Sequence, residues 1–170
     1  MLEIPCEVSD SFDRIVQERE TRVLRAAYRI LGNWADAEDV AQEVFLRLHR
    51  HGLSFANDAA FGAWLYRVTV NLCLDRTRVR SARPSVEITE LPSVEQSAEA
   101  SLIREQEKTQ LMAALATLPP RERAAVVLRE IEGLSTRDVA EAMGSAEVTV
   151  RSQVAKAIGR LRGLMTREAR

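Results

Sequence analysis

A short stretch near residue 40 concentrates side chains that could carry out chemistry. Residues 36 to 43 hold four carboxylates and no base, and histidines follow at positions 49 and 51. The acidic side chains are Asp36, Glu38, Asp39 and Glu43. Such a cluster is typical either of a metal or acid/base site or of a surface that another protein binds. Which interpretation holds depends on how the helix that carries these acids arranges them.

The pattern around the acids predicts a helix from about residue 34 to Arg50. Asn33 is placed to cap its N-terminus. Apolar residues recur at helical spacing and predict a buried face. This face consists of Ala37, Val40, Ala41, Val44, Phe45 and Leu48. Asp36 and Glu38 fall in the first turn, where acids offset the helix dipole.

The opposite face of this helix has the composition of a docking patch. Leu46 lies about 180° from the centre of the apolar face by helical geometry. Around it lie Asp39, Gln42, Glu43 and Arg50. An exposed leucine ringed by acids and an amide favours a protein-binding surface.

The metal interpretation is weaker because no histidine joins the acids. His49 is a turn or more away, and His51 falls in the following loop. Carboxylates without a positioned histidine, nucleophile or ligand cluster do not make an active site. We therefore expect no catalytic residue, no metal and no cofactor.

Composition predicts an all-α protein. The chain has 170 residues with only 7 glycines and 5 prolines, and it shows little β-branched alternation. No run reaches the ~20 apolar residues of a membrane span. The N-terminus lacks the basic start and apolar run of a signal peptide, so we expect a cytoplasmic protein. Cys6 and Cys73 fit neither a zinc knuckle nor a redox pair.

A net charge of −1 conceals separated acidic and basic elements. Residues 67 to 83 carry five arginines and one acid, residues 84 to 103 carry four acids and no base, and residues 148 to 163 carry four bases and no acid. Patches matter more than totals for binding. The distribution therefore permits a nucleic-acid partner that the total alone argues against.

The helical periodicity of the sequence also divides the chain into two helical regions joined by a linker. Helical periodicity covers about residues 9 to 31, as one helix or two, and resumes after Asp58, a candidate cap, up to about Arg80. Residues 81 to 100 are acidic and lack sustained periodicity, which predicts a linker. Further helices follow from near Ala100, with a break before Pro120.

The C-terminal part has the layout of a helix-turn-helix. Ser135 can cap a short helix that ends at Gly144, and a longer helix follows the turn. Thr149, Ser152 and Lys156 share one face of that helix with Arg160, while Arg151 and Arg162 flank it. Polar residues at the start and bases further along favour a DNA-recognition helix. A solvated basic face is the alternative.

A second polar row lies on the predicted helix that follows Asp58. Arg67, Asn71 and Arg78 line up away from its apolar stripe, and Arg80 follows them. The row could track a nucleic-acid strand. A surface ridge with Asp75 as an ion-pair partner is the alternative, and the row taken alone favours it.

Three stretches together resemble the extracytoplasmic-function (ECF) sigma factors, group IV of the sigma-70 family. They are GNWADAEDVAQEVFLRLHR, FGAWLYRVTVNLCLDRTRVR and LPPRERAAVVLREIEGLSTRDVAEAMGSAEVTVRSQVAKAIGRLR. The resemblance implies two small helical domains, sigma domain 2 over residues 1–83 and a helix-turn-helix sigma domain 4 over residues 104–170. An acidic linker over residues 84–103 joins them.

The resemblance also implies a function. By this resemblance, the protein is expected to bind core RNA polymerase and direct it to promoters, under the control of an anti-sigma factor. Asp39, Gln42, Glu43 and Leu46 match the positions that dock on the clamp coiled coil of the β′ subunit, and domain 4 contacts the β flap. By the same resemblance, the linker is expected to pass through the RNA exit path, where its acids would mimic nucleic acid.

Promoter DNA contacts are implied at two elements. Asn71 matches a position that reads an unpaired base of the minus 10 element, and the arginines around it meet the backbone. The residues at the minus 10 element are Arg67, Asn71, Arg76, Arg78 and Arg80. Those at the minus 35 element are Thr149, Arg151, Ser152, Gln153, Lys156 and Arg160.

This chain departs from the family pattern at the start of the last helix. Relatives often have Ser-x-Gly-Thr-Val where this chain has residues 146–150, so the cap is expected at Ser145. Gln153, Ala155 and Gly159 replace frequent bases, which predicts weaker general DNA affinity.

Three other functions stay open. They are an operator-binding regulator, a sigma mimic that sequesters an anti-sigma factor, and a metal hydrolase at the carboxylates. In the free chain we expect the two domains to close on each other and mask the basic helices.

Overall fold

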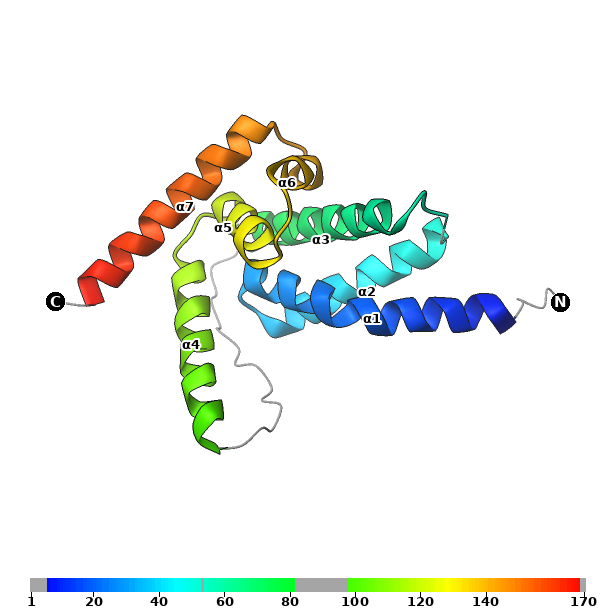
Figure 1. The fold of residues 1–170 in the computed structure, drawn as a ribbon, viewed down its shortest axis with the longest axis horizontal. Helices are drawn as coiled ribbons and strands as arrows, with labels where there is room; N and C mark the ends of the chain where they lie inside the picture. The colour runs from blue at the N-terminus through cyan, green and yellow to red at the C-terminus, as the bar shows by residue number, and fades with distance from the viewer. Residues whose placement is uncertain (1–5, 53, 82–97, 169–170) are drawn as a thin grey trace.

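The computed structural model describes residues 6–52, 54–81 and 98–168, and within these ranges the chain is helical with no strand. Figure 1 shows a bundle with α4 and α7 projecting from it. The elements are α1 (Cys6–Leu31), α2 (Trp34–His51), α3 (Asp58–Ser81), α4 (Ala98–Ala116), α5 (Pro120–Val126), the π-helical turn η1 (Val127–Ile131), α6 (Thr136–Met143) and α7 (Glu147–Glu168). None of the described helices is long and apolar enough to cross a membrane.

The N-terminal half packs α1, α2 and α3 together. The first predicted segment is one helix, which ends before Gly32 at a φ of 72°. The predicted apolar face of α2 is confirmed, since all six of its residues are buried. This burial orients the opposite face of α2, with Leu46, toward solvent.

Two polar caps determine where α2 and α3 begin. The side chain of Asn33 accepts a hydrogen bond from the Asp36 N–H at 2.9 Å, as predicted. The cap of α3 was predicted at Asp58 but is Asn57, whose Oδ1 accepts from the Ala60 N–H at 2.8 Å. Asp58 instead lies in the first turn, where it pairs with Arg19.

The C-terminal half contains the helix-turn-helix. Ser135 caps α6 by accepting from the Asp138 N–H at 3.1 Å, as predicted. Gly144 follows α6 in the left-handed conformation with a φ of 57°, which favours glycine. The 3.1 Å bond from the Val150 N–H to the Ala146 carbonyl opens α7. The buried Ser145 hydroxyl has no hydrogen-bond partner, so the expected cap at Ser145 is wrong.

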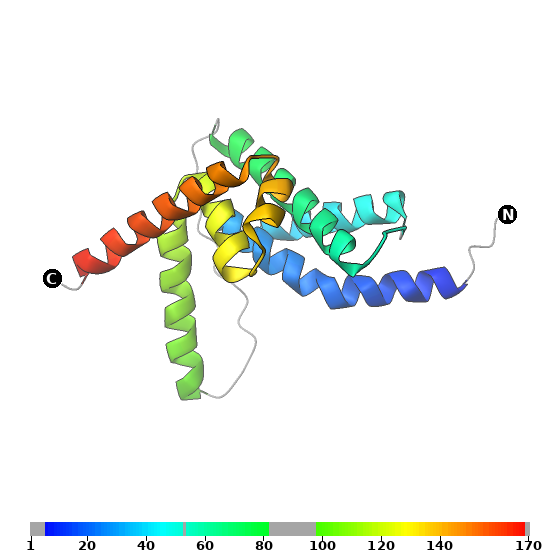
Figure 2. The same ribbon diagram turned by 45° about the horizontal axis from the view of Figure 1, so that its top comes forward.

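The two halves pack on each other, chiefly α6 against α3 (Figures 1 and 2). Their buried apolar side chains form one core. Glu132 accepts hydrogen bonds across the interface from Tyr66 and from Arg29, each at 2.8 Å. Arg123 donates to the Ile30 carbonyl at 3.1 Å. Burial at this interface and the Glu132 carboxylate raise the pKa of Tyr66 to about 12.

The predicted linker lies largely outside the described residues, because residues 82–97 are not among them. The structure therefore describes the two ends that the linker joins, α3 and α4. The helical region predicted from near Ala100 begins at Ala98.

Candidate functional site

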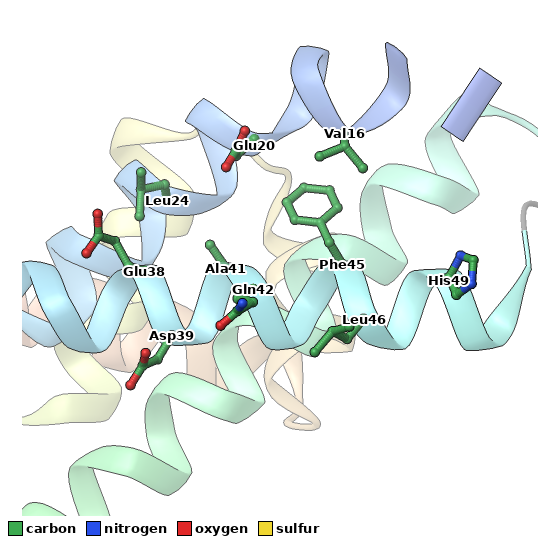
Figure 3. A pocket seen from close by; sticks show the side chains of 10 residues that line it. All are labelled: Val16, Glu20, Leu24, Glu38, Asp39, Ala41, Gln42, Phe45, Leu46 and His49. Atoms are coloured by element: carbon green, nitrogen blue, oxygen red, sulfur yellow. The ribbon is translucent and has the colours of Figure 1, made fainter. Parts of the chain in front are cut away.

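The docking patch predicted on α2 borders a groove between α1 and α2. The groove has a volume of about 680 Å³. Its lining residues come from both helices (Figure 3) and are Val16, Glu20, Leu24, Glu38, Asp39, Ala41, Gln42, Phe45, Leu46 and His49. Leu46 is 46% exposed although it is a large apolar residue. The groove therefore combines an apolar floor with acidic and amide groups.

Figure 3 shows how the two helices share this surface. Phe45 points toward α1, while Asp39 and Leu46 lie on the side of α2 away from α1. The contribution of α1 was missed in the sequence analysis. Val16 and Leu24 lie two helical turns apart, a spacing that places them on one face. This signal becomes interpretable only once α1 is paired with α2.

Glu43 does not line the groove. It accepts a 2.7 Å hydrogen bond from Arg47 one turn later, which is the main reason that the pKa of its carboxyl lies below the ordinary value. The patch predicted from the sequence is thus brought together at Asp39, Gln42 and Leu46, with Glu43 beside it.

The acids of α2 are distributed among different partners. Glu38 accepts from the indole N–H of Trp34 at 2.9 Å, and Asp36 and Asp39 pair with Arg76. Among the described residues, no three or more histidine, cysteine or acidic side chains gather as a metal site. His51 stacks on Phe55 with 5.1 Å between ring centroids.

The arginines of α3 divide into two groups. Arg76 Nη1 lies 3.1 Å from both Asp36 Oδ1 and Asp39 Oδ2, and Arg80 Nη1 lies 3.1 Å from Asp36 Oδ2. Arg78 pairs locally with Asp75 at 3.2 Å.

The remaining residues of this row, Arg67 and Asn71, are exposed on α3. Together with the exposed Arg78 they form a polar surface that is accessible to a nucleic-acid strand. Arg76 and Arg80 are held by carboxylates of the neighbouring helix instead.

The predicted recognition helix presents its polar face to solvent. Burial of Val150 and Ala157 fixes the orientation of α7. The exposed residues on the other side are Thr149, Arg151, Ser152, Lys156 and Arg160, while Gln153 is half-buried. The packing of the two halves leaves these residues accessible, so the expectation that closure masks the basic helix is wrong for them.

Two bases of α7 are already engaged within the domain. Arg160 lies 3.0 Å from Glu122 of α5, whose side chain is only 12% exposed. Arg151 pairs with Glu147 one turn earlier at 2.8 Å. Ser152 and Lys156 therefore occupy the centre of the accessible polar face.

Val148 was missed in the sequence analysis. It lies in the first turn of α7 and is 68% exposed, beside the polar face. An exposed β-branched residue at the start of a recognition helix suits contact with a thymine methyl group. Val148 carries no charge, so the charge pattern of this helix does not single it out.

The chain is similar to known proteins along most of its length. Residues 15–83 match Sigma-70 region 2, and residues 108–161 match Sigma-70, region 4. It is 36% identical to ECF RNA polymerase sigma factor SigE of Mycolicibacterium smegmatis, over 94% of this chain and 63% of that protein. It is 35% identical to ECF RNA polymerase sigma factor SigM of Mycobacterium tuberculosis, over 91% of this chain and 77% of that protein.

A solved structure shows the same fold. The sigma factor RpoE, in complex with the anti-sigma factor NepR from Bartonella quintana, matches with a TM-score of 0.73. The match covers 92% of this chain and 97% of that chain at 21% sequence identity. At this identity the likeness concerns the fold.

Proposed function

The chain belongs to the ECF sigma factors of the sigma-70 family, and from this premise we propose how it docks on polymerase and reads a promoter. Sigma factors are transcription initiation factors, which confirms the prediction that the chain is not an enzyme. What remains to be assigned is which surface contacts which partner.

The groove between α1 and α2 supports the docking proposal. Leu46 exposes apolar area at its rim, and the side chain of Asp39 is 62% exposed. An amphipathic helix with apolar and basic residues complements such a surface. We propose that the helix bound here belongs to the clamp coiled coil of the β′ subunit. The residues that contact it are Asp39, Gln42, Glu43 and Leu46.

Promoter recognition is assigned to two helices. On α3, Arg67, Asn71 and Arg78 are exposed and face the minus 10 element, and Arg76 and Arg80 join them when released from their carboxylates. On α7, the residues at the minus 35 element are Thr149, Arg151, Ser152, Gln153, Lys156 and Arg160. Val148 adds an apolar contact there.

The remaining assignments follow the same premise. Domain 2 spans residues 1–83, the linker 84–103 and domain 4 residues 104–170. Domain 4 contacts the β flap, and an anti-sigma factor controls the protein in the cytoplasm, where the polymerase acts.

Run-off transcription with purified core polymerase on genomic fragments tests this proposal. Wild type is expected to give discrete transcripts. Asp39→Arg should abolish them by repelling basic groups of the clamp, and Lys156→Glu should abolish them while leaving core binding intact. Absence of wild-type transcripts with core from the same organism, or full activity of both variants, contradicts the proposal.

A further inference from the structure

Asp36 lies between the proposed docking surface and the proposed DNA surface. Its two carboxylate oxygens form ion pairs with different arginines of α3. Oδ1 lies 3.1 Å from Arg76 Nη1, and Oδ2 lies 3.1 Å from Arg80 Nη1. Its side chain is 33% exposed, so these pairs are partly shielded from water. The sequence analysis assigned Asp36 only to the helix start, which does not account for this geometry.

Arg76 connects the same cluster to the docking surface. Its Nη1 atom is 3.1 Å from Asp36 and 3.1 Å from Asp39, the acid assigned to polymerase. The two acids and two arginines sum to zero charge. A DNA phosphate approaching Arg76 or Arg80 therefore meets groups whose charge is neutralised from within the protein.

We propose that Asp36 is a positioning residue that, together with Asp39, holds Arg76 and Arg80 away from DNA, and that engagement of Asp39 by polymerase loosens Arg76 toward the promoter. The inference rests on the proposed function, because it needs Asp39 to be a docking residue. When a basic group of the polymerase pairs with Asp39, Arg76 loses one of its two carboxylate partners. By linkage, DNA bound to Arg76 strengthens polymerase binding by the same factor.

Binding of a mixed-sequence single-stranded DNA oligonucleotide to the free protein tests the restraint without polymerase. Asp36→Asn should raise affinity about fivefold, the scale of a partly exposed ion pair, because Arg80 loses the Asp36 carboxylate and Arg76 keeps only Asp39. The log–log salt slope should steepen by about 0.7 for each further phosphate that the released arginines neutralise. Asp39→Asn should raise affinity through Arg76 alone.

Glu38→Gln is the matched control. It removes the same charge from the same turn of α2, but Glu38 bonds to Trp34 and not to an arginine. It should change affinity less than Asp36→Asn does. The effect of Asp36→Asn should also shrink in an Arg76→Gln background, a non-additivity that a change in net charge alone does not produce. Equal effects of Asp36→Asn and Glu38→Gln, or full additivity with Arg76→Gln, overturn the proposal.

The polymerase arm separates this inference from the proposed function. Saturating core should raise oligonucleotide affinity more for wild type than for Asp39→Asn, which has already lost the carboxylate of Arg76 that core is proposed to engage. If wild type fails to bind core while the oligonucleotide results hold, the restraint stands and the docking assignment fails. If core binds but raises the DNA affinity of wild type and of Asp39→Asn equally, the coupling is wrong.

Discussion

At the scale of single residues, burial decides which groups can react. Cys73 is fully buried in α3, and this burial raises the pKa of its thiol to about 12. The thiolate is the nucleophilic form. A side chain that looks reactive in the sequence is thus a small apolar core residue.

Thiol labelling checks this account. In a Cys6→Ser background at pH 8, Cys73 should react with a disulfide reagent about a thousandfold more slowly than a free thiol, because three pKa units separate it from the ordinary value of 9.0. Unfolding in guanidinium should restore the normal rate. Fast labelling of the native protein would show that Cys73 is accessible.

At the scale of elements, the sequence predicted the helices better than the partners of their polar side chains. The apolar face of α2 and the cap at Ser135 follow from local spacing, and both are found. Asn57 rather than Asp58 caps α3, because adjacent residues with similar capping ability are separated only by backbone geometry.

The candidate site shows the same limit. Leu46 could be identified from one helix alone, since its position opposite the core is a matter of periodicity. The groove beside it needed α1, and the ion pairs of Arg76 and Arg160 needed α2 and α5. Contacts between elements far apart in the sequence are not encoded in periodicity.

At the scale of the whole molecule, Glu132 joins the two halves by polar contacts beside their shared apolar core. Its side chain is 7% exposed and accepts hydrogen bonds from Arg29 and Tyr66 of the other half. The pKa of Tyr66 is raised from 10.0 to about 12, so the neutral phenol stabilises the packed state. This contribution is complete below pH 10.0 and is lost as the pH rises through about 12.

Glu132→Lys should weaken closure by about 3 kcal/mol or more, because it places a cation beside Arg29 in a shielded site. Solution scattering should show a larger radius of gyration than wild type, and Glu130→Lys, at an exposed position of η1, should not. In Glu132→Gln, ultraviolet titration should show the pKa of Tyr66 below about 12, because burial still raises this pKa but the added effect of the carboxylate is gone. Unchanged scattering and titration would mean that Glu132 does not hold the halves together.

The affinity of the protein for core polymerase, measured for Leu46→Glu beside Val79→Glu, tests the central claim most directly. Both substitutions place a carboxylate at an exposed apolar position, at 46% exposure on α2 and 67% on α3. If the surface formed by the groove and Leu46 is the docking surface, Leu46→Glu should weaken binding about thirtyfold, as expected when a carboxylate replaces an apolar residue that the partner buries. Val79→Glu should stay within about twofold of wild type, the scale of a neutral surface site. Wild-type affinity of a folded Leu46→Glu variant would contradict the account.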